Sequence, residues 1–455
     1  MASNFNLTNE FLDTLIEAIE NDESVTVHKL IDALHPVDIA DIYHELSIDQ
    51  ARYIHLLLDS EKAADVLMEL EEDVREQFLE TLPGHVIAHQ FIEKLDSDDA
   101  ADVLNELSDA KKTEILQSIE DAEQAGDIAD LLNYDEDTAG GLMAKELIKV
   151  NINWDLVTCM REMRKQAAEI DEIYYVYVID DDGILKGTLS LKRMLVTRPN
   201  AKIKNIYNDN VISVLADTPS KEVALVMEKY DLVALPVIDI LGRLIGRITI
   251  DDVVDIIKEE AEKDYQMISG LSEDVETSDN VFLLTRARIP WLFIGLTGGI
   301  LGAQVISRFE GQISTYPQMA MFIPLIAAMG GNVGVQSSSI VVQGIANKTL
   351  NLDSTWKKLV KEVSVAFFNA AIFSILIFVY NYFFSTGLNL TIMVSLSLFT
   401  VMMFASVFGA FIPMLLNRFK IDPALATGPF VTTMNDVFGI VIYMSIGRLI
   451  FMAIQ

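Results

Sequence analysis

Charge and hydrophobicity are divided between two parts of this chain, and one soluble core cannot hold both. Of its 455 residues, 51% are hydrophobic and 22% are charged. The residues before Arg286 contain 62 of the 67 acidic and 24 of the 34 basic side chains, about −38 in total, whereas the apolar remainder carries about +5. A chain of this length is expected to form two or three domains. The division therefore predicts an acidic soluble part followed by a membrane part.

Five apolar stretches follow Arg288, and each is long enough to cross the hydrocarbon layer, which needs about 20 helical residues. They cover residues 289–307, 317–346, 363–386, 388–417 and 423–453. In this arrangement one side of the membrane receives eight of the ten basic residues, which are Arg286, Arg288, Lys348, Lys357, Lys358, Lys361, Arg418 and Lys420. Basic residues favour the cytosolic side, so the N-terminus is predicted to lie in the cytosol and the C-terminus outside.

The last apolar stretch contains a carboxylate far from either of its ends. A charge at the bilayer centre costs at least ~2.5 kcal/mol on insertion scales, so Asp436 is expected to be functional. Thr432 and Asn435 lie beside it, and Pro429 frees the carbonyl of Leu425 from helical bonding. Oxygen ligands of this kind suit Mg²⁺, which keeps several of its waters. A carboxylate coupled to protons in an antiporter, or one that only fixes helix packing, would have the same sequence.

Small residues indicate where the membrane helices meet. Two Gly-x-x-x-Gly spacings, Gly295–Gly299 and Gly298–Gly302, allow close packing within one chain or between two. The run MGGNVGVQSSS at Met329–Ser339 places amides and hydroxyls at bilayer depth. Because unsatisfied polar groups there cost several kcal/mol each, this run is predicted to line protein or a wet cavity.

Two repeats organise the acidic part. Four short segments share an Ala-Asp pair followed by apolar positions, with the aspartate at Asp41, Asp65, Asp102 and Asp130. This pattern predicts stacked helical hairpins that form a small superhelical domain. The repeated acids are either a solvated helix face or part of a cation sensor.

The second repeat is mixed α/β. Tyr175–Leu195 and Leu232–Val254 match at a constant offset of 59, and each copy is predicted to be a β-hairpin, with its turn near Gly183 or Gly242, followed by a helix. The double match resembles a tandem CBS (Bateman) domain, a module that binds nucleotides or senses ions. An acidic helix, Asp251–Lys263, is predicted to continue from the second copy towards the membrane.

The CBS resemblance also concerns a nucleotide. The ribose-binding Thr-x-x-Asp pattern of that family is present at Thr249 and Asp252, whereas the first copy has Ser190 and Arg193. Only one copy therefore matches the pattern for ATP or another adenine nucleotide.

The order of these modules resembles the MgtE family of magnesium channels over essentially the full chain. The tightest matches are TAGGLM (Thr138–Met143), GGNVGVQS (Gly330–Ser337) and IDPALATGPFVTTMND (Ile421–Asp436). The resemblance implies a homodimer that imports Mg²⁺ across the plasma (inner) membrane, with a pore on the two-fold axis. It implies that a hydrated ion is held there by Asp436, Thr432, Gly428 and Asn332.

The same resemblance implies a cytosolic sensor whose occupation by Mg²⁺ closes the pore. Its acidic positions in this sequence are Asp65, Asp98, Asp102, Asp231, Asp252, Asp255, Glu260, Asp264 and Asp422. Lys221 and Lys263 stand at two further positions where an acid is expected, so the threshold of the sensor is expected to differ from that of relatives.

Together these features predict a multidomain protein. An α-helical superhelical domain at 1–135 is followed by an α/β tandem CBS domain at 136–256, a connecting (plug) helix at 257–285 and a five-helix all-α transmembrane domain at 286–455. A proton- or sodium-coupled divalent-cation antiporter with the same topology is the alternative function.

Other classes are disfavoured. The acidic surface would repel nucleic acid. The single Cys159 excludes an intramolecular disulfide framework, and the sequence has no phosphate-binding loop for ATP hydrolysis, so an enzyme is not expected. The acidic start without a long apolar segment does not resemble a signal peptide.

Overall fold

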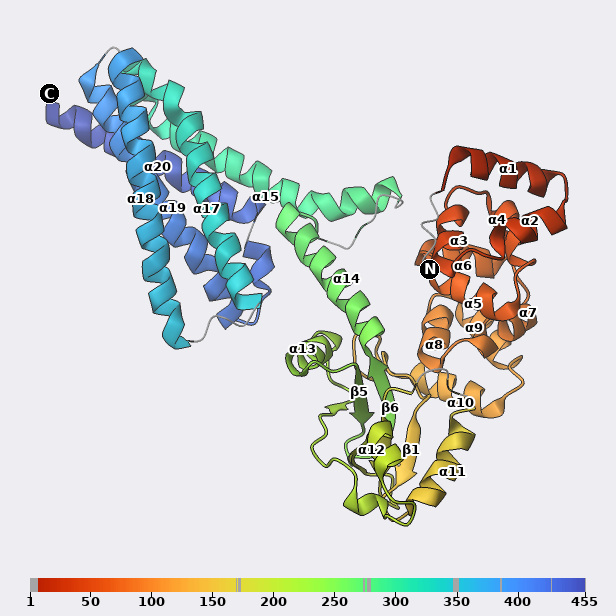
Figure 1. The fold of residues 1–455 in the computed structure, drawn as a ribbon. Helices are drawn as coiled ribbons and strands as arrows, with labels where there is room; N and C mark the ends of the chain where they lie inside the picture. The colour runs from red at the N-terminus through yellow and green to blue at the C-terminus, as the bar shows by residue number, and fades with distance from the viewer. Residues whose placement is uncertain are drawn as a thin grey trace. The chain divides into compact units, whose positions relative to one another are not determined.

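The structure is a computed structural model, in which the chain separates into two compact units, Met1–Lys258 and Glu259–Gln455 (Figure 1). Each unit is described by itself below. The described residues are 7–168, 170, 173–272, 275, 280–346, 352–384, 387–426 and 428–454. The predicted cytosolic Lys348 lies outside them, as do the side chains of Lys357 and Lys358.

The first unit begins with short helices, as the helical repeat predicts. They are α1 (Asn9–Glu20), α2 (Ser24–Ile31), α3 (Pro36–Tyr43), α4 (Ile48–His55), α5 (Ser60–Met68), α6 (Glu72–Glu80), α7 (Gly84–Gln90), η1 (Ile92–Lys94), α8 (Ser97–Asn105), α9 (Asp109–Leu116) and α10 (Ala122–Leu131). Successive hairpins contact one another through α3 with α5, α5 with α7, α7 with α9 and α8 with α10.

The Ala-Asp pattern of the repeat separates a buried face from an exposed one. In α5, Ala64 and Leu67 are fully buried, whereas Asp65 between them faces solvent. In α8, Ala101 is buried and Asp102 is exposed in the same way. Small alanines let the helices approach closely, and the acids are left on the outside.

Two small sheets follow, and they reproduce the predicted duplication. The first contains β1 (Ile148–Asn151), β2 (Val176–Ile179) and β3 (Leu185–Leu189), and the second contains β4 (Val214–Leu215), β5 (Ala234–Ile238) and β6 (Leu244–Thr249). In each sheet the first strand pairs in parallel with the second, and the second pairs antiparallel with the third. The accompanying helices are α11 (Leu156–Gln166), α12 (Leu191–Val196), α13 (Ser220–Tyr230) and the short η2 (Ile203–Asn205).

The offset of 59 residues holds even for the irregularities. Both hairpins shift register within the second strand, after Val178 in one and after Val237 in the other. The turn glycines Gly183 and Gly242 adopt φ of +80° and +81°, a left-handed conformation that favours glycine. The predicted tandem β-hairpins are therefore confirmed.

The acidic helix after the second sheet is longer than predicted. It is α14 (Ile250–Ser269), which begins in the first unit and ends in the second. Val253 and Ile256 of its predicted apolar stripe are buried, whereas Ile257 is 46% exposed.

Among the residues of the second unit that the structure describes, five helices are long and apolar enough to cross a membrane. The elements are α15 (Val281–Arg308), α16 (Glu310–Thr315), η3 (Pro317–Phe322), α17 (Ile323–Ala346), α18 (Leu352–Phe384), α19 (Leu388–Arg418), η4 (Pro423–Ala426) and α20 (Pro429–Ile454). Helix α19 contacts α17, α18 and α20, and α15 packs against α20.

Three element boundaries differ from the apolar stretches. Helix α15 starts eight residues before 289 because the Asn280 side chain accepts hydrogen bonds from the N–H groups of Phe282 and Leu283. The third helix starts at Leu352, well before 363, and the predicted end of that stretch at 386 lies outside the described residues. The last stretch is broken at Gly428, which has φ of +60° and precedes Pro429.

The predicted small-residue contacts form within the unit. A Cβ at Gly298 would lie 1.7 Å from Cγ2 of Thr433, so only glycine allows α15 to approach α20 this closely. By contrast, a Cβ at Gly295 or Gly299 would meet nothing within 4 Å. One glycine spacing therefore packs helices of the same chain, whereas the other faces open space.

Candidate functional site

The membrane carboxylate lies where α20 faces the glycine-rich part of α17. Asp436 is half-buried, and a Cβ at Gly331 would lie 3.1 Å from its Oδ1 and 3.0 Å from Cγ2 of Thr432. Any larger residue at position 331 would therefore fill the space beside the carboxylate. Asp436, Thr432 and Gly331 thus form one group, which we call the membrane site.

Gly428, another residue of the predicted ion site, precedes the helix that carries Asp436. Its carbonyl accepts hydrogen bonds from N–H and Oγ1 of Thr432, at 3.1 and 3.0 Å, so it closes the first turn of α20. A Cβ at Gly428 would lie 2.4 Å from the carbonyl oxygen of Ile268, which belongs to the last turn of α14. The end of the acidic helix is therefore in close contact with the start of the helix that carries Asp436.

The polar run on α17 has two faces. Ser337 and Ser338 are buried, whereas Asn332 and Gln336, four residues apart, are exposed. Asn332 directly follows the glycine that faces Asp436. The buried face agrees with the prediction that this run does not contact lipid, because other helices of the same chain cover it. No other part of the described chain covers the exposed face.

Two features of this unit were missed from the sequence. Asn435 is 1% exposed, and neither atom of its amide group has a hydrogen-bond partner among the described residues. A Cβ at Gly334 would collide with Nδ2 of Asn435 at 1.8 Å. Between α17, α18 and α19, Ser337 Oγ donates to Glu362 Oε1 at 2.7 Å and lies 2.9 Å from Ser406 Oγ. In the sequence, the only indications of these contacts are the polar pair Asn435-Asp436 and the acidic Glu362 close to an apolar stretch.

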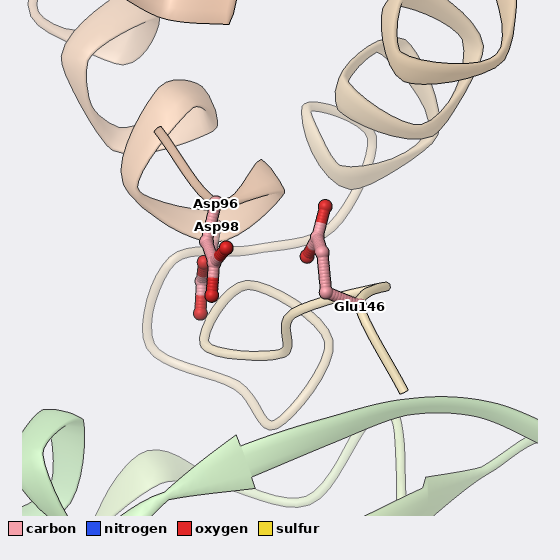
Figure 2. A group of neighbouring side chains, drawn as sticks. All are labelled: Asp96, Asp98 and Glu146. Carbon is pink, nitrogen blue, oxygen red and sulfur yellow. The ribbon is translucent and has the colours of Figure 1, made fainter. Parts of the chain in front are cut away.

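In the first unit, carboxylates gather between α8 and the segment after α10. One oxygen from each of Asp96, Asp98 and Glu146 lies within 4.8 Å of the others (Figure 2). Ser97 Oγ donates to Glu146 Oε2 at 2.8 Å and accepts from Lys145 N–H at 2.9 Å, which fixes the segment against the start of α8.

An arginine from β6 completes this arrangement. Arg247 is buried, lies 3.3 Å from Asp96 and donates to the backbone oxygen of Glu146. It pairs with Asp96, and acidic side chains still outnumber basic ones in this arrangement. Two or three carboxylates with room for water are a suitable ligand set for Mg²⁺.

Three of the predicted sensor acids meet here. The pKa of Asp98 is raised well above its usual range by burial and then by the charge of Asp252, and burial likewise raises the pKa of Asp252. Asp102 is influenced by the same acids. Part of its side chain is exposed to solvent, but the protein atoms around the carboxyl group desolvate it and raise its pKa to about 7. Asp99, which was not predicted, also has a pKa of about 7, from burial first and then from Asp252. We call Asp96, Asp98, Asp99, Asp102, Glu146 and Asp252 the acidic cluster.

The predicted nucleotide pair is engaged within the chain. Thr249 donates from N–H and from Oγ1 to Oδ2 of Asp252, at 3.0 and 2.6 Å. These bonds turn the Asp252 carboxylate towards the start of α14, where it also acts on Asp98.

A second group of acids surrounds Glu69. Burial raises the pKa of Glu69, and the charges of Asp255, Asp65 and Asp41 raise it further, while His35 opposes the shift. The charges of the predicted sensor residues Asp65 and Asp255 therefore act on the same glutamate, which sequence reasoning missed.

The remaining predicted residues are not gathered into these groups. Asp231 ends α13 in a left-handed conformation, with φ of +51°. Asp422 accepts a hydrogen bond from Ala424 N–H at 2.8 Å and caps η4. Glu260 and Asp264 lie on the part of α14 that belongs to the second unit.

The raised pKa values predict a specific pH dependence of stability. Asp99 has a pKa of about 7 in the fold and near 4 when unfolded, so between these values the folded chain binds more protons. Stability without Mg²⁺ should therefore increase as pH falls from 8 to 6, by about 1 kcal/mol from Asp99 alone, or roughly 2–4 °C in Tm. Thermal unfolding of the full chain in detergent with EDTA measures this.

The matched comparison is the Asp99→Asn variant. Buried His55, whose pKa is lowered to about 4, acts in the opposite direction below pH 6.5 but is retained in both proteins. Asp109→Asn, a change of an exposed acid, should leave the pH dependence as it is. Identical pH profiles for wild type and Asp99→Asn would refute the assignment.

Comparisons with known proteins agree along the whole chain. A model of the divalent cation transporter family MgtE matches residues 323–446, the MgtE intracellular N domain matches 34–137, and the CBS domain matches 139–197 and 203–259. The magnesium transporter MgtE of Thermus thermophilus is 32% identical over 444 residues, which cover 97% of this chain and 98% of that protein. The magnesium transporter MgtE of Enterococcus faecalis is 33% identical over 438 residues, which cover 96% of this chain and 96% of that protein.

Among solved structures, the first unit is matched by a cytosolic domain. The crystal structure of the cytosolic domain of the Mg²⁺ channel MgtE in complex with ATP has a TM-score of 0.51 and 34% identity, and it covers 54% of this chain and 99% of that one. With five apolar helices, a helical N domain and tandem CBS domains, the chain is an integral membrane protein for cation transport and not an enzyme. It belongs to the MgtE family of magnesium transporters, as the three sequence motifs predicted.

Proposed function

We propose that this chain is a Mg²⁺ channel that works as a homodimer, imports the ion across the plasma (inner) membrane and is closed by Mg²⁺ on its cytosolic part. The membrane site is the observation that carries this proposal. Asp436 packs closely against the backbone of α17 at Gly331, and it lies in the interior of the last apolar helix. Carboxylates of two copies, with oxygens of Thr432, Gly428 and Asn332, would hold a hydrated Mg²⁺ between the chains.

The uncovered face of α17 supports the dimer. Asn332 and Gln336 are exposed in one chain at a depth where lipid cannot satisfy an amide. A second copy facing this surface would enclose a water-filled path between two α17 helices. The paired Asp436 carboxylates would then lie on either side of the two-fold axis, with the C-terminus of each chain outside.

Gating is supported by the acidic cluster and by the end of α14. Like charges about 4 Å apart repel by ~4 kcal/mol at an effective dielectric of 20, so the cluster without Mg²⁺ favours separation of α8 from α14. Bound Mg²⁺ bridges these acids and stabilises the arrangement of the described fold. Because the last turn of α14 touches Gly428, a displacement of α14 is transmitted to the helix that carries Asp436. The acids around Glu69, together with Asp231, Glu260, Asp264 and Asp422, are further regulatory candidates.

An adenine nucleotide is the second proposed ligand of the cytosolic part. The relative crystallised with ATP supports it, and Thr249 and Asp252 are the candidate contacts. Asp252 would then serve both the nucleotide and the acidic cluster, so the two ligands should affect each other's binding.

Reconstituted liposomes test the function directly. Mg²⁺ entry should follow the Mg²⁺ gradient and fall as Mg²⁺ on the cytosolic side is raised, whatever the proton or sodium gradient. Entry that requires a proton or sodium gradient would favour a coupled antiporter instead.

A further inference from the structure

A cavity in the second unit lies where three elements meet. It has a volume of about 540 Å³, within the range of ligand-binding cavities. Gly270 at the end of α14, Arg288, Trp291, Leu292 and Gly295 on α15, and Pro429 at the start of α20 are among the residues that line it. None of these residues belongs to the membrane site.

The two ends of the cavity differ in chemistry. Arg288 is exposed and supplies a positive charge, and it lies at the start of the first apolar stretch. Beyond it, Leu292 and Leu296 are 67% and 62% exposed, and Gly295 leaves the wall between them open. These positions are three and four residues apart, so they form one apolar strip along α15 next to the charge.

Trp291 adds a buried donor to this wall. The residue is 8% exposed, and its indole N–H finds no acceptor in the part of the chain that the structure describes. Tryptophan is also typical of the level at which lipid headgroups lie.

We propose that this cavity binds an anionic phospholipid of the cytosolic leaflet. Its phosphate would pair with Arg288, its headgroup region would lie against the Trp291 side chain, and an acyl chain would lie along Leu292, Gly295 and Leu296. A soluble anion would leave the apolar strip uncovered, and a neutral lipid would gain less from Arg288. Anionic lipids are attracted to basic residues at the cytosolic surface, where the distribution of basic residues places this end of α15.

The position of the cavity gives the lipid a regulatory role. A Cβ at Gly270 would lie 2.9 Å from Cγ of Pro429, so the end of α14 and the start of α20 touch at its wall. A lipid there braces the same junction that transmits movement of α14 to α20. Binding of the lipid can be tested without any flux measurement.

Quenching of Trp291 by brominated lipids tests the proposal. The chain has three tryptophans, so replacing Trp154 and Trp356 by Phe leaves Trp291 as the single fluorophore. In nanodiscs, brominated phosphatidylglycerol should quench Trp291 at a roughly fivefold lower mole fraction than brominated phosphatidylcholine, the preference expected for one basic residue at an anionic surface. Arg288→Gln should abolish this preference, and Arg286→Gln, which removes the same charge two residues away, should retain it.

A second pair of variants tests the apolar strip. A Cβ meets nothing within 4 Å at either Gly295 or Gly299. Gly295→Leu adds bulk at the cavity wall and should reduce quenching by both lipids, whereas Gly299→Leu, one turn away, should not. Equal quenching by the two lipids in the parent chain, or equal loss in both leucine variants, would overturn the proposal. Relief of quenching by millimolar glycerol 3-phosphate would also overturn it, because the cavity would then be a soluble-anion site.

Discussion

Replacing Asp436 with Asn is expected to lower Mg²⁺ uptake at least about a hundredfold while the protein still inserts into the membrane. The substitution keeps the shape of the side chain and removes its charge. Attraction between unit charges about 4 Å apart amounts to ~4 kcal/mol at an effective dielectric of 20. Because Mg²⁺ carries two charges, its binding free energy should fall by more than this when the carboxylate is replaced by a neutral amide. Insertion should become easier, because a charge at the bilayer centre opposes it.

The measurement is Mg²⁺ uptake by a transport-deficient host, normalised to the amount of protein in the membrane. Asp436→Glu retains the charge and should retain part of the uptake. Glu310→Gln removes an acid from the same unit outside the membrane site and should leave uptake near the wild-type level. Wild-type uptake by a well-expressed Asp436→Asn variant would exclude Asp436 as an essential ion ligand.

Local signals in the sequence were sufficient for the elements of the fold. Hydropathy located the five membrane helices, and the offset of 59 residues located both hairpins, down to the glycines at 183 and 242. Boundaries were less predictable where a side chain decides them. Asn280 caps α15 and so starts the helix before its apolar stretch, and no periodicity contains that information.

The candidate sites were only partly predictable because they depend on contacts between distant residues. The family resemblance pointed to Asp98 and Asp252, but Asp96, Asp99 and Glu146 join them only through the fold. Likewise, the glycine-rich run on α17 predicted close packing, but not that Gly331 faces Asp436 and Gly334 faces Asn435. The sequence identified residues with unusual chemistry, and the fold determined which of them meet.

Neutralising two members of the acidic cluster should remove the response to cytosolic Mg²⁺. In the wild type, raising cytosolic Mg²⁺ from micromolar to about ten millimolar should reduce flux by roughly tenfold or more, a coupling of the usual size between two sites. In a variant with Asp98→Asn and Asp252→Asn, flux at the two concentrations should be nearly equal. The physical reason is that Mg²⁺ can favour the closed state only if it binds that state more tightly than the open state. Without the two carboxylates, this difference in affinity is lost.

The same variant separates the sensor from the pore. A control with Asp49→Asn and Asp109→Asn changes the net charge of the first unit by the same amount at exposed positions and should keep the Mg²⁺ response. Limited proteolysis of the full chain should show protection by Mg²⁺ in the wild type and in the control, but not in the cluster variant. If the cluster variant kept both its protection and its response in flux, gating would have to depend on other acids, of which those around Glu69 are the next to test. If it lost protection but kept the response, the acidic cluster would be a Mg²⁺ site without a connection to the pore.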